Sequence, residues 1–170
     1  VSGGKVAFAG AMLFILIHGL AKAGLFLCAG IIEHKVHTKD LDKMGGLLKY
    51  MPFTAVAFAC CALSVMGIPP FAGFFSKFLV IIGSVMDGNV FTGFAFIICA
   101  AFTVLYIVRL FTKIFLGEER GDFKLLPKEK VFSPMVFSVI ILAVLSLGFG
   151  LFFGDIFTIA NLAANQMITI

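Results

Sequence analysis

The stretch GIPPFAGFFSK, residues 67–77, places two prolines, two glycines and a lysine inside a long apolar part of the chain. Proline lacks an amide donor and disfavours helix at the residue before it, so the backbone here must be irregular. At membrane depth, irregular backbone is tolerated only where protein covers it or water lines it. We therefore predict a broken helix with an ion site at Lys77, the alternative being a tight hairpin in which the lysine only packs. The residues of the predicted break are Gly67, Pro69, Pro70 and Gly73.

The composition around this stretch is that of a membrane protein. Of the 170 residues, 61% are hydrophobic and 13% charged, and the mean hydropathy is +1.14. Because soluble domains are typically about half apolar, an ordinary soluble fold is excluded. The net charge of +4 is spread over connectors, which gives a nucleic-acid partner no support. The cysteines lie in apolar runs without metal-ligand spacing and are interpreted as packing residues; they are Cys28, Cys60, Cys61 and Cys99.

The apolar runs predict an all-α transmembrane fold. A hydrocarbon core of ~30 Å needs about 20 helical residues. We expect five membrane-spanning helices, the third short or broken near Gly67–Gly73, in one membrane domain covering residues 1–170. Their ranges are 6–32, 47–66, 68–86, 91–116 and 131–153. The tail 154–170 either lies along the membrane interface or begins further structure.

The polar connectors predict the orientation. With five crossings, residues 33–46 lie on the side opposite to residues 117–130. The distribution of lysine and arginine favours a cytoplasmic place for 117–130. Arg109 and Lys113, at the end of the fourth span, are expected to anchor that helix at the membrane interface.

A second lysine, Lys22, lies in the middle of the first span, and His18 precedes it by one helical turn. A charged residue at the centre of a membrane helix costs about 2.5–3.5 kcal/mol on insertion scales and marks ion or proton pathways. In water, imidazole titrates near pH 6.5 and lysine near 10.4. Such a pair can exchange protons through a short water chain. The alternative is a pair that donates to backbone carbonyls and serves packing.

The predicted spans contain no carboxylate. Glu33 and Asp87 stand only at span ends, so we expect a counter-ion from another part of the protein or from a partner subunit. His34 and His37 have loose spacing in a charged connector, which favours solvated residues over a metal site. We expect neither a metal nor a cofactor in this chain.

Four segments carry a resemblance to a known family. Residues 18–30, HGLAKAGLFLCAG, and 40–47, DLDKMGGL, resemble the antiporter-like membrane subunits of respiratory complex I. The same core occurs in Mrp-type cation/proton antiporters and membrane-bound hydrogenases. Residues 63–77, LSVMGIPPFAGFFSK, are similar to the family's second signature, a discontinuous helix with a titratable residue. The resemblance covers roughly residues 6–117, including the segment 105–111.

The resemblance implies roles for these residues. The family core has roughly fourteen helices with two inverted repeats, and this chain would be its C-terminal fragment. Lys22 and His18 would belong to the central hydrophilic axis, and Lys77 would exchange the terminal proton. Phe14 stands where some members carry a second histidine. Lysine rather than glutamate at 77 favours the distal, L-type subunit or its Mrp and hydrogenase relatives.

We therefore predict a subunit that translocates protons, or sodium ions, and is driven by a redox module outside this chain. It would have no redox chemistry of its own and would belong to a translocase such as NADH:quinone oxidoreductase or a membrane-bound hydrogenase. Expected partners are other membrane subunits, the missing N-terminal part, and lipid of a bacterial or archaeal inner membrane. The alternatives are an Mrp-type sodium/proton antiporter subunit, a transporter of an organic solute, and a purely structural subunit. A structural subunit would work unchanged with Lys22 or Lys77 neutralised.

Overall fold

The computed structural model describes residues 4–121, 123, 129–130 and 133–168, and this part of the chain is helical without any strand. The all-α prediction is thereby confirmed for these residues. In chain order the elements are α1 (Lys5–Val36), η1 (Leu41–Lys43), η2 (Leu47–Lys49), α2 (Pro52–Met66), α3 (Ala72–Met86), α4 (Val90–Phe111), the π-helical turn η3 (Thr112–Leu116), α5 (Pro134–Leu151) and α6 (Phe153–Ile168).

Helix length separates these elements into two classes. Within the described residues, three helical segments are long and apolar enough to cross a membrane: Lys5–Val36, Val90–Leu116 and Pro134–Leu151. Helices α2 and α3 have 15 residues each, which gives about 22 Å of helix, less than a ~30 Å hydrocarbon core. Neither of them is long enough to cross alone.

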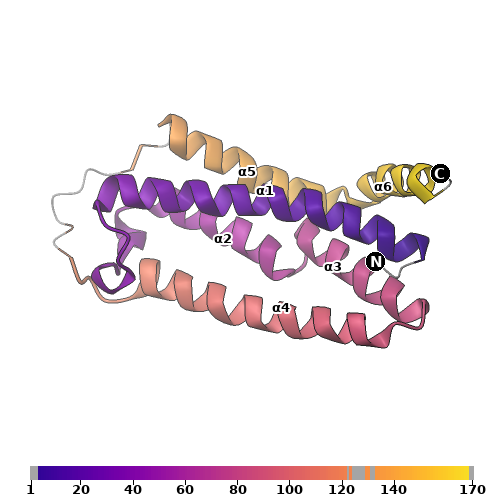
Figure 1. Cartoon of the computed structure of the whole chain (residues 1–170). Helices are drawn as coiled ribbons and strands as arrows, with labels where there is room; N and C mark the ends of the chain where they lie inside the picture. The colour runs from indigo at the N-terminus through magenta and orange to yellow at the C-terminus, as the bar shows by residue number, and fades with distance from the viewer. Residues whose placement is uncertain (1–3, 122, 124–128, 131–132, 169–170) are drawn as a thin grey trace.

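Helices α2 and α3 lie end to end along α1 (Figure 1). The N-terminal half of α1 packs on α3, where a Cβ on Gly10 would stand 2.7 Å from the Cβ of Leu79. The C-terminal half packs on α2, where the Cys28 thiol donates to the carbonyl oxygen of Thr54 at 3.8 Å. The two short helices thus follow one line antiparallel to α1. The chain therefore continues in one direction through the break instead of reversing there (Figure 1), and the number of membrane crossings stays a prediction.

The connectors consequently meet at one end of the bundle. Lys49 Nζ lies 3.0 Å from Glu119 Oε1, and Lys113 Nζ lies 2.5 Å from Asp42 Oδ1. Because α2 and α3 together make one traverse, α4 returns to the end where α1 finishes. The prediction that 33–46 and 117–130 lie on opposite sides is therefore wrong.

The core has two parts. The larger lies between α1, α2, α4 and α5 and includes Phe58, Ile107 and Phe115. The smaller joins α6 to α1 and α3 through Leu13, Ile17, Ala72 and Ala160. The tail predicted from residue 154 onward is thus mostly a helix that packs against the bundle, and its last two residues lie outside the described part. Helix α4 contributes little to either part, since only Gly93 and Ile107 of its 22 residues are buried.

Candidate functional site

The break between α2 and α3 depends on glycine at two positions. Helix α2 ends at Met66, and Gly67 follows with φ 80°, its N–H donating to the carbonyls of Leu63 and Ser64 at 3.0 and 3.1 Å. A residue with a Cβ is strained in this left-handed conformation. A Cβ on Gly73 would overlap the carbonyl oxygen of Ser64 and stand 2.7 Å from its carbonyl carbon. Only glycine lets the first turn of α3 touch the last turn of α2.

Lys77 reaches back across this break. Its ammonium donates to the carbonyl oxygens of Val65, at 2.8 Å, and Met66, at 3.2 Å. The last carbonyls of a helix have no partner within the helix and carry the negative end of its dipole. For Lys77, the C-terminal end of α2 thus provides negative partial charge within the same chain, while a carboxylate from another part of the protein or from a partner subunit stays a prediction.

Glu129 occupies the other end of α2. Its Oε2 accepts the N–H groups of Phe53, at 2.8 Å, and Thr54, at 3.1 Å, and its Oε1 accepts the Thr54 hydroxyl. An anion at the N-terminus and a cation at the C-terminus both match the helix dipole. The sequence gives no local signal for the role of Glu129, because this residue lies 75 residues after Thr54 and helix-start signals act only within a few residues.

The structure brings His18 and the two lysines together. The charges of both Lys22 and Lys77 act on the His18 imidazole. The ring stacks on Phe14 with 4.9 Å between centroids, and Phe14 meets Phe96 of α4 edge-on at 5.9 Å. The imidazole thus contacts α4 indirectly, through the ring of Phe14.

Lys22 has different surroundings from Lys77. It lines a cavity of about 350 Å³ between α1, α2, α4 and the connector around η1. Most of the wall is apolar, and Glu33 and Lys39 stand at the connector end. Within the described ranges, Lys22 has no hydrogen bond or ion pair. The cavity therefore extends from Lys22 to the connector residues Glu33 and Lys39.

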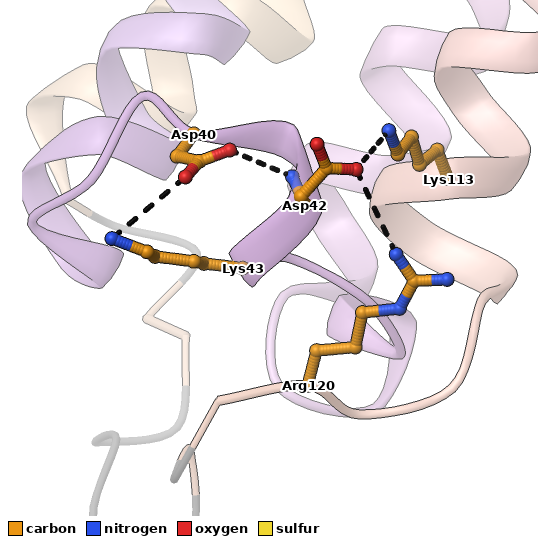
Figure 2. Close-up of polar contacts among 5 residues, drawn as sticks. All are labelled: Asp40, Asp42, Lys43, Lys113 and Arg120. Atoms are coloured by element: carbon orange, nitrogen blue, oxygen red, sulfur yellow. Dashed lines mark hydrogen bonds and ion pairs between the residues drawn. The ribbon is translucent and has the colours of Figure 1, made fainter.

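Acidic and basic side chains join the two connectors (Figure 2). Asp42 Oδ1 lies 2.5 Å from Lys113 Nζ and 3.9 Å from Arg120 Nη1, while Asp40 accepts the Asp42 N–H at 3.0 Å. The hydrogen bond from Lys113 holds the pKa of Asp42 below its ordinary value. The hydrogen bond to Glu119 raises the pKa of Lys49.

Arg109 lies in the last turn of α4, and Lys113 lies in η3, which follows it. The Lys113 side chain is 29% exposed and is paired with Asp42, while Arg109 is exposed near the end of α4. Their role as interface anchors stays a prediction. The rings of His34 and His37 lie 6.5 Å apart, and no group of three potential metal ligands occurs among the residues with described positions.

Comparisons with known proteins identify the family of the chain. The family model for NADH:quinone oxidoreductase/Mrp antiporter membrane segments matches residues 1–103. Na(+)/H(+) antiporter subunit A1 of Staphylococcus saprophyticus is 38% identical over 157 residues, covering 86% of this chain and 19% of that protein. NADH-quinone oxidoreductase subunit L of Mycobacterium tuberculosis is 37% identical over 121 residues, covering 69% of this chain and 19% of that protein.

A solved structure extends the comparison to the fold. The Mrp complex from Dietzia sp. matches with a TM-score of 0.83 and 24% identity, covering 96% of this chain and 38% of that one. This chain spans about a fifth of the length of the two curated relatives. The family model covers more than half of the chain, and both relatives share more than a third of the aligned residues with it. The chain belongs to the NADH:quinone oxidoreductase/Mrp antiporter membrane family.

Proposed function

We propose that this chain moves protons, or sodium ions, across the membrane as part of an antiporter-like subunit in a larger assembly. One observation carries the proposal, namely the Lys77 ammonium held by helix-end carbonyls at an interrupted helix. Interrupted helices whose ends face an ion are a recurrent way of building transport sites at the membrane midplane. Family membership supports the same reading.

The three titratable groups suit proton transfer. Imidazole can accept a proton at one nitrogen and donate one from the other, so His18 can connect Lys22 with Lys77. Because both ammonium charges act on His18, a proton arriving at one group favours release from another by repulsion between like charges. The cavity beside Lys22 would supply protons from the connector end. No step in this scheme requires a large motion of the helices.

We infer four membrane crossings: α1, the α2–α3 pair, α4 with η3, and α5. The end-to-end arrangement of α2 and α3 supports this count, since the two together reach the length of one crossing. The basic residues at the connector end are Lys35, Lys39, Lys43, Lys49, Lys113, Arg120 and Lys130, whereas Lys5 lies at the other end among the described residues. The positive-inside rule then makes the connector end, with 117–130, cytoplasmic. We assign the protein to a bacterial or archaeal inner membrane.

Partners are inferred from the surface and from the relatives. Helix α4 exposes large apolar side chains such as Phe91, Phe94 and Leu105, and lipid or other membrane subunits would cover them. The curated relatives are subunits of antiporters or of NADH-quinone oxidoreductase. By this analogy, the energy would come from an ion gradient or from a redox module outside the chain.

The test is proton uptake into proteoliposomes that contain the intact subunit in its assembly. Lys77→Met should abolish nearly all uptake, because the side chain can no longer bind a proton. Lys77→Glu should keep part of it with a shifted pH optimum, since a buried carboxyl can also exchange protons near neutral pH. Uptake at the wild-type rate by a fully assembled Lys77→Met variant would show that Lys77 is off the pathway.

A further inference from the structure

We propose that Glu129 is a positioning residue for transport: through Thr54 it fixes the place of α2, and thereby of the helix end that holds the Lys77 ammonium. The inference rests on the proposed function, because a positioning role requires a transport site at the other end of the helix. Glu129 itself need not bind the transported ion. It acts from the connector that follows α4, at the end of α2 opposite to Lys77.

The first support is the set of free backbone donors at the start of α2. Within the described part of the chain, the N-cap residue Met51 makes no side-chain cap hydrogen bond, and Pro52 at the first helical position has no N–H. The next two N–H groups, those of Phe53 and Thr54, both donate to Glu129 Oε2, at 2.8 and 3.1 Å. Unsatisfied N–H groups at a helix start are costly away from water. One carboxylate of the connector therefore completes the first turn of α2.

The second support is that Thr54 joins three elements. It is fully buried, with 0% of its surface exposed. Its hydroxyl donates to Glu129 Oε1, and its carbonyl oxygen accepts the Cys28 thiol of α1 at 3.8 Å. We call Cys28, Thr54 and Glu129 the polar junction. Because Cys28 lies less than two helical turns after Lys22, the polar junction sets α2 against the helix that carries the other lysine of the site.

The third support is the close contact at the far end of α2. The helix has 15 residues, about 22 Å of continuous hydrogen-bonded backbone, and shifts along its axis as one body. A Cβ on Gly73 would stand 2.7 Å from the carbonyl carbon of Ser64, so the two helix ends are in contact. The Lys77 ammonium lies 2.8 and 3.2 Å from its two carbonyl acceptors. A shift of α2 by about 1 Å would take at least one of these distances out of hydrogen-bond range.

Further contacts hold the connector against the start of α2. Glu119 Oε1 lies 3.0 Å from Lys49 Nζ, and Glu119 Oε2 accepts the Tyr50 hydroxyl at 3.4 Å. The ring of Phe123, which is buried, meets the Tyr50 ring edge-on with 6.3 Å between centroids. Exposed ion pairs contribute little energy on their own. These contacts therefore guide the connector to α2, while the polar junction fixes the helix itself.

The experiment measures amide hydrogen exchange in the intact subunit within its assembly. It compares residues 53–57, at the start of α2, with residues 67–71, at the break. Glu129→Ala and Thr54→Val should each speed exchange roughly 3–10-fold in both segments, because loss of the junction frees the whole helix. Thr54→Ser keeps the hydroxyl and should restore most of the protection. Glu129→Gln keeps an acceptor oxygen and should give an intermediate result.

Two variants serve as controls. Glu118→Gln changes an exposed carboxylate of the same connector and should exchange as the wild type does. Val139→Ala removes two methyl groups from a buried position of α5, so it lowers stability without touching the polar junction. It should change exchange in both segments by less than about twofold. General loosening of the bundle is thereby separated from a shift of α2.

Proton uptake into proteoliposomes is the second measurement. Glu129→Ala and Thr54→Val should lower uptake by about tenfold, because displacement of a positioned group by about 1 Å is costly for function. Thr54→Ser and both controls should take up protons at nearly the wild-type rate. Native gels would show that each variant assembles.

Two results would overturn the inference. In the first, Glu129→Ala and Thr54→Val speed exchange only in residues 53–57, which makes Glu129 an ordinary helix cap. In the second, exchange at the break rises while uptake stays at the wild-type rate. The Lys77→Met variant judges the proposed function separately. If that variant loses uptake while the junction variants behave as wild type, the proposed function stands and the positioning role is wrong.

Discussion

Lys22 and Lys77 are both lysines in apolar helices of one bundle, yet the fold accommodates them in different ways. Lys77 follows a helix break and donates to two carbonyl oxygens of α2. Lys22 belongs to the uninterrupted helix α1 and faces a cavity of about 350 Å³. A membrane protein can thus stabilise an ammonium by interrupting a helix or by leaving space for water beside an intact one. The two solutions differ in what remains when the lysine is removed.

The largest effect is expected from closing the break. Gly73→Ala should lower the free energy of unfolding by about 3 kcal/mol, because the new Cβ meets backbone atoms of Ser64 that cannot move aside. Thermal or denaturant unfolding of the purified protein in detergent measures this change. Gly148→Ala in α5 is the control, since a Cβ there meets nothing within 4 Å. A Gly73→Ala protein as stable as the control would mean that the helix ends are not in contact.

The second prediction compares the lysines directly. Lys77→Met should cost about 2 kcal/mol of stability, because it leaves two carbonyls of α2 without a charged donor. Lys22→Met should change stability by less than about 0.5 kcal/mol, since no hydrogen bond is lost. The measurement is the unfolding midpoint of both variants in the same detergent. Equal losses would remove the distinction between a lysine held by carbonyls and one that faces a cavity.

The third prediction concerns the opposite end of α2. Glu129→Ala should destabilise the protein by about 1 kcal/mol, the usual cost of losing a helix N-cap. Glu129→Gln should retain part of the stability, because the amide oxygen still accepts an N–H. Glu118→Ala, an exposed carboxylate of the same connector, is the control. If the Glu118 and Glu129 variants behave alike, Glu129 does not cap α2 in solution.

The smallest effect is expected at the Asp42–Lys113 pair, where Asp42 is solvent-exposed. The pKa of Asp42 is lowered in the folded protein. The ion pair therefore contributes to the stability of the fold above the pKa of the unfolded state, about 3.9, and this contribution is lost as the pH falls through the pKa of the folded state. Asp42→Asn should therefore flatten the acid side of the stability profile slightly. Unfolding midpoints between about pH 2 and pH 5 test this. An unchanged acid limb in the variant would show that the pair contributes nothing.

The sequence was sufficient to predict the helical fold and the position of the break, but not the direction of the chain after it. Proline and glycine at 67–73 indicate that the helix stops. They are equally compatible with a reversal and with a continuation along the same line. The hydropathy of the segment is the same in either case. The difference is set by packing on α1, through contacts such as Gly10 with Leu79, which no local pattern contains.

The titratable residues of the candidate site stand out in the sequence, whereas the atoms that contact them do not. Lys22, His18 and Lys77 are recognisable because charge inside an apolar run is costly. The acceptors of Lys77 are backbone atoms, which every residue carries, so composition cannot single out Val65 and Met66. Glu129 and Asp42 act on helices that lie about 70 or more residues away in sequence. These pairs can be recognised only in the folded structure.

The position of the break also decides how much of the membrane potential a charge crosses on its way to Lys77. Helices α2 and α3 have equal length, 15 residues each, so the Lys77 ammonium lies about half-way along the traverse that they form. An elementary charge crossing the whole membrane exchanges about 2.3 kcal/mol with a potential of 100 mV. Under the proposed function, a proton that moves between Lys77 and either surface would exchange about half of this, roughly 1.2 kcal/mol. The rate of that step should change several-fold across the range of resting potentials, which would make the broken helix a voltage-dependent element of the transport cycle.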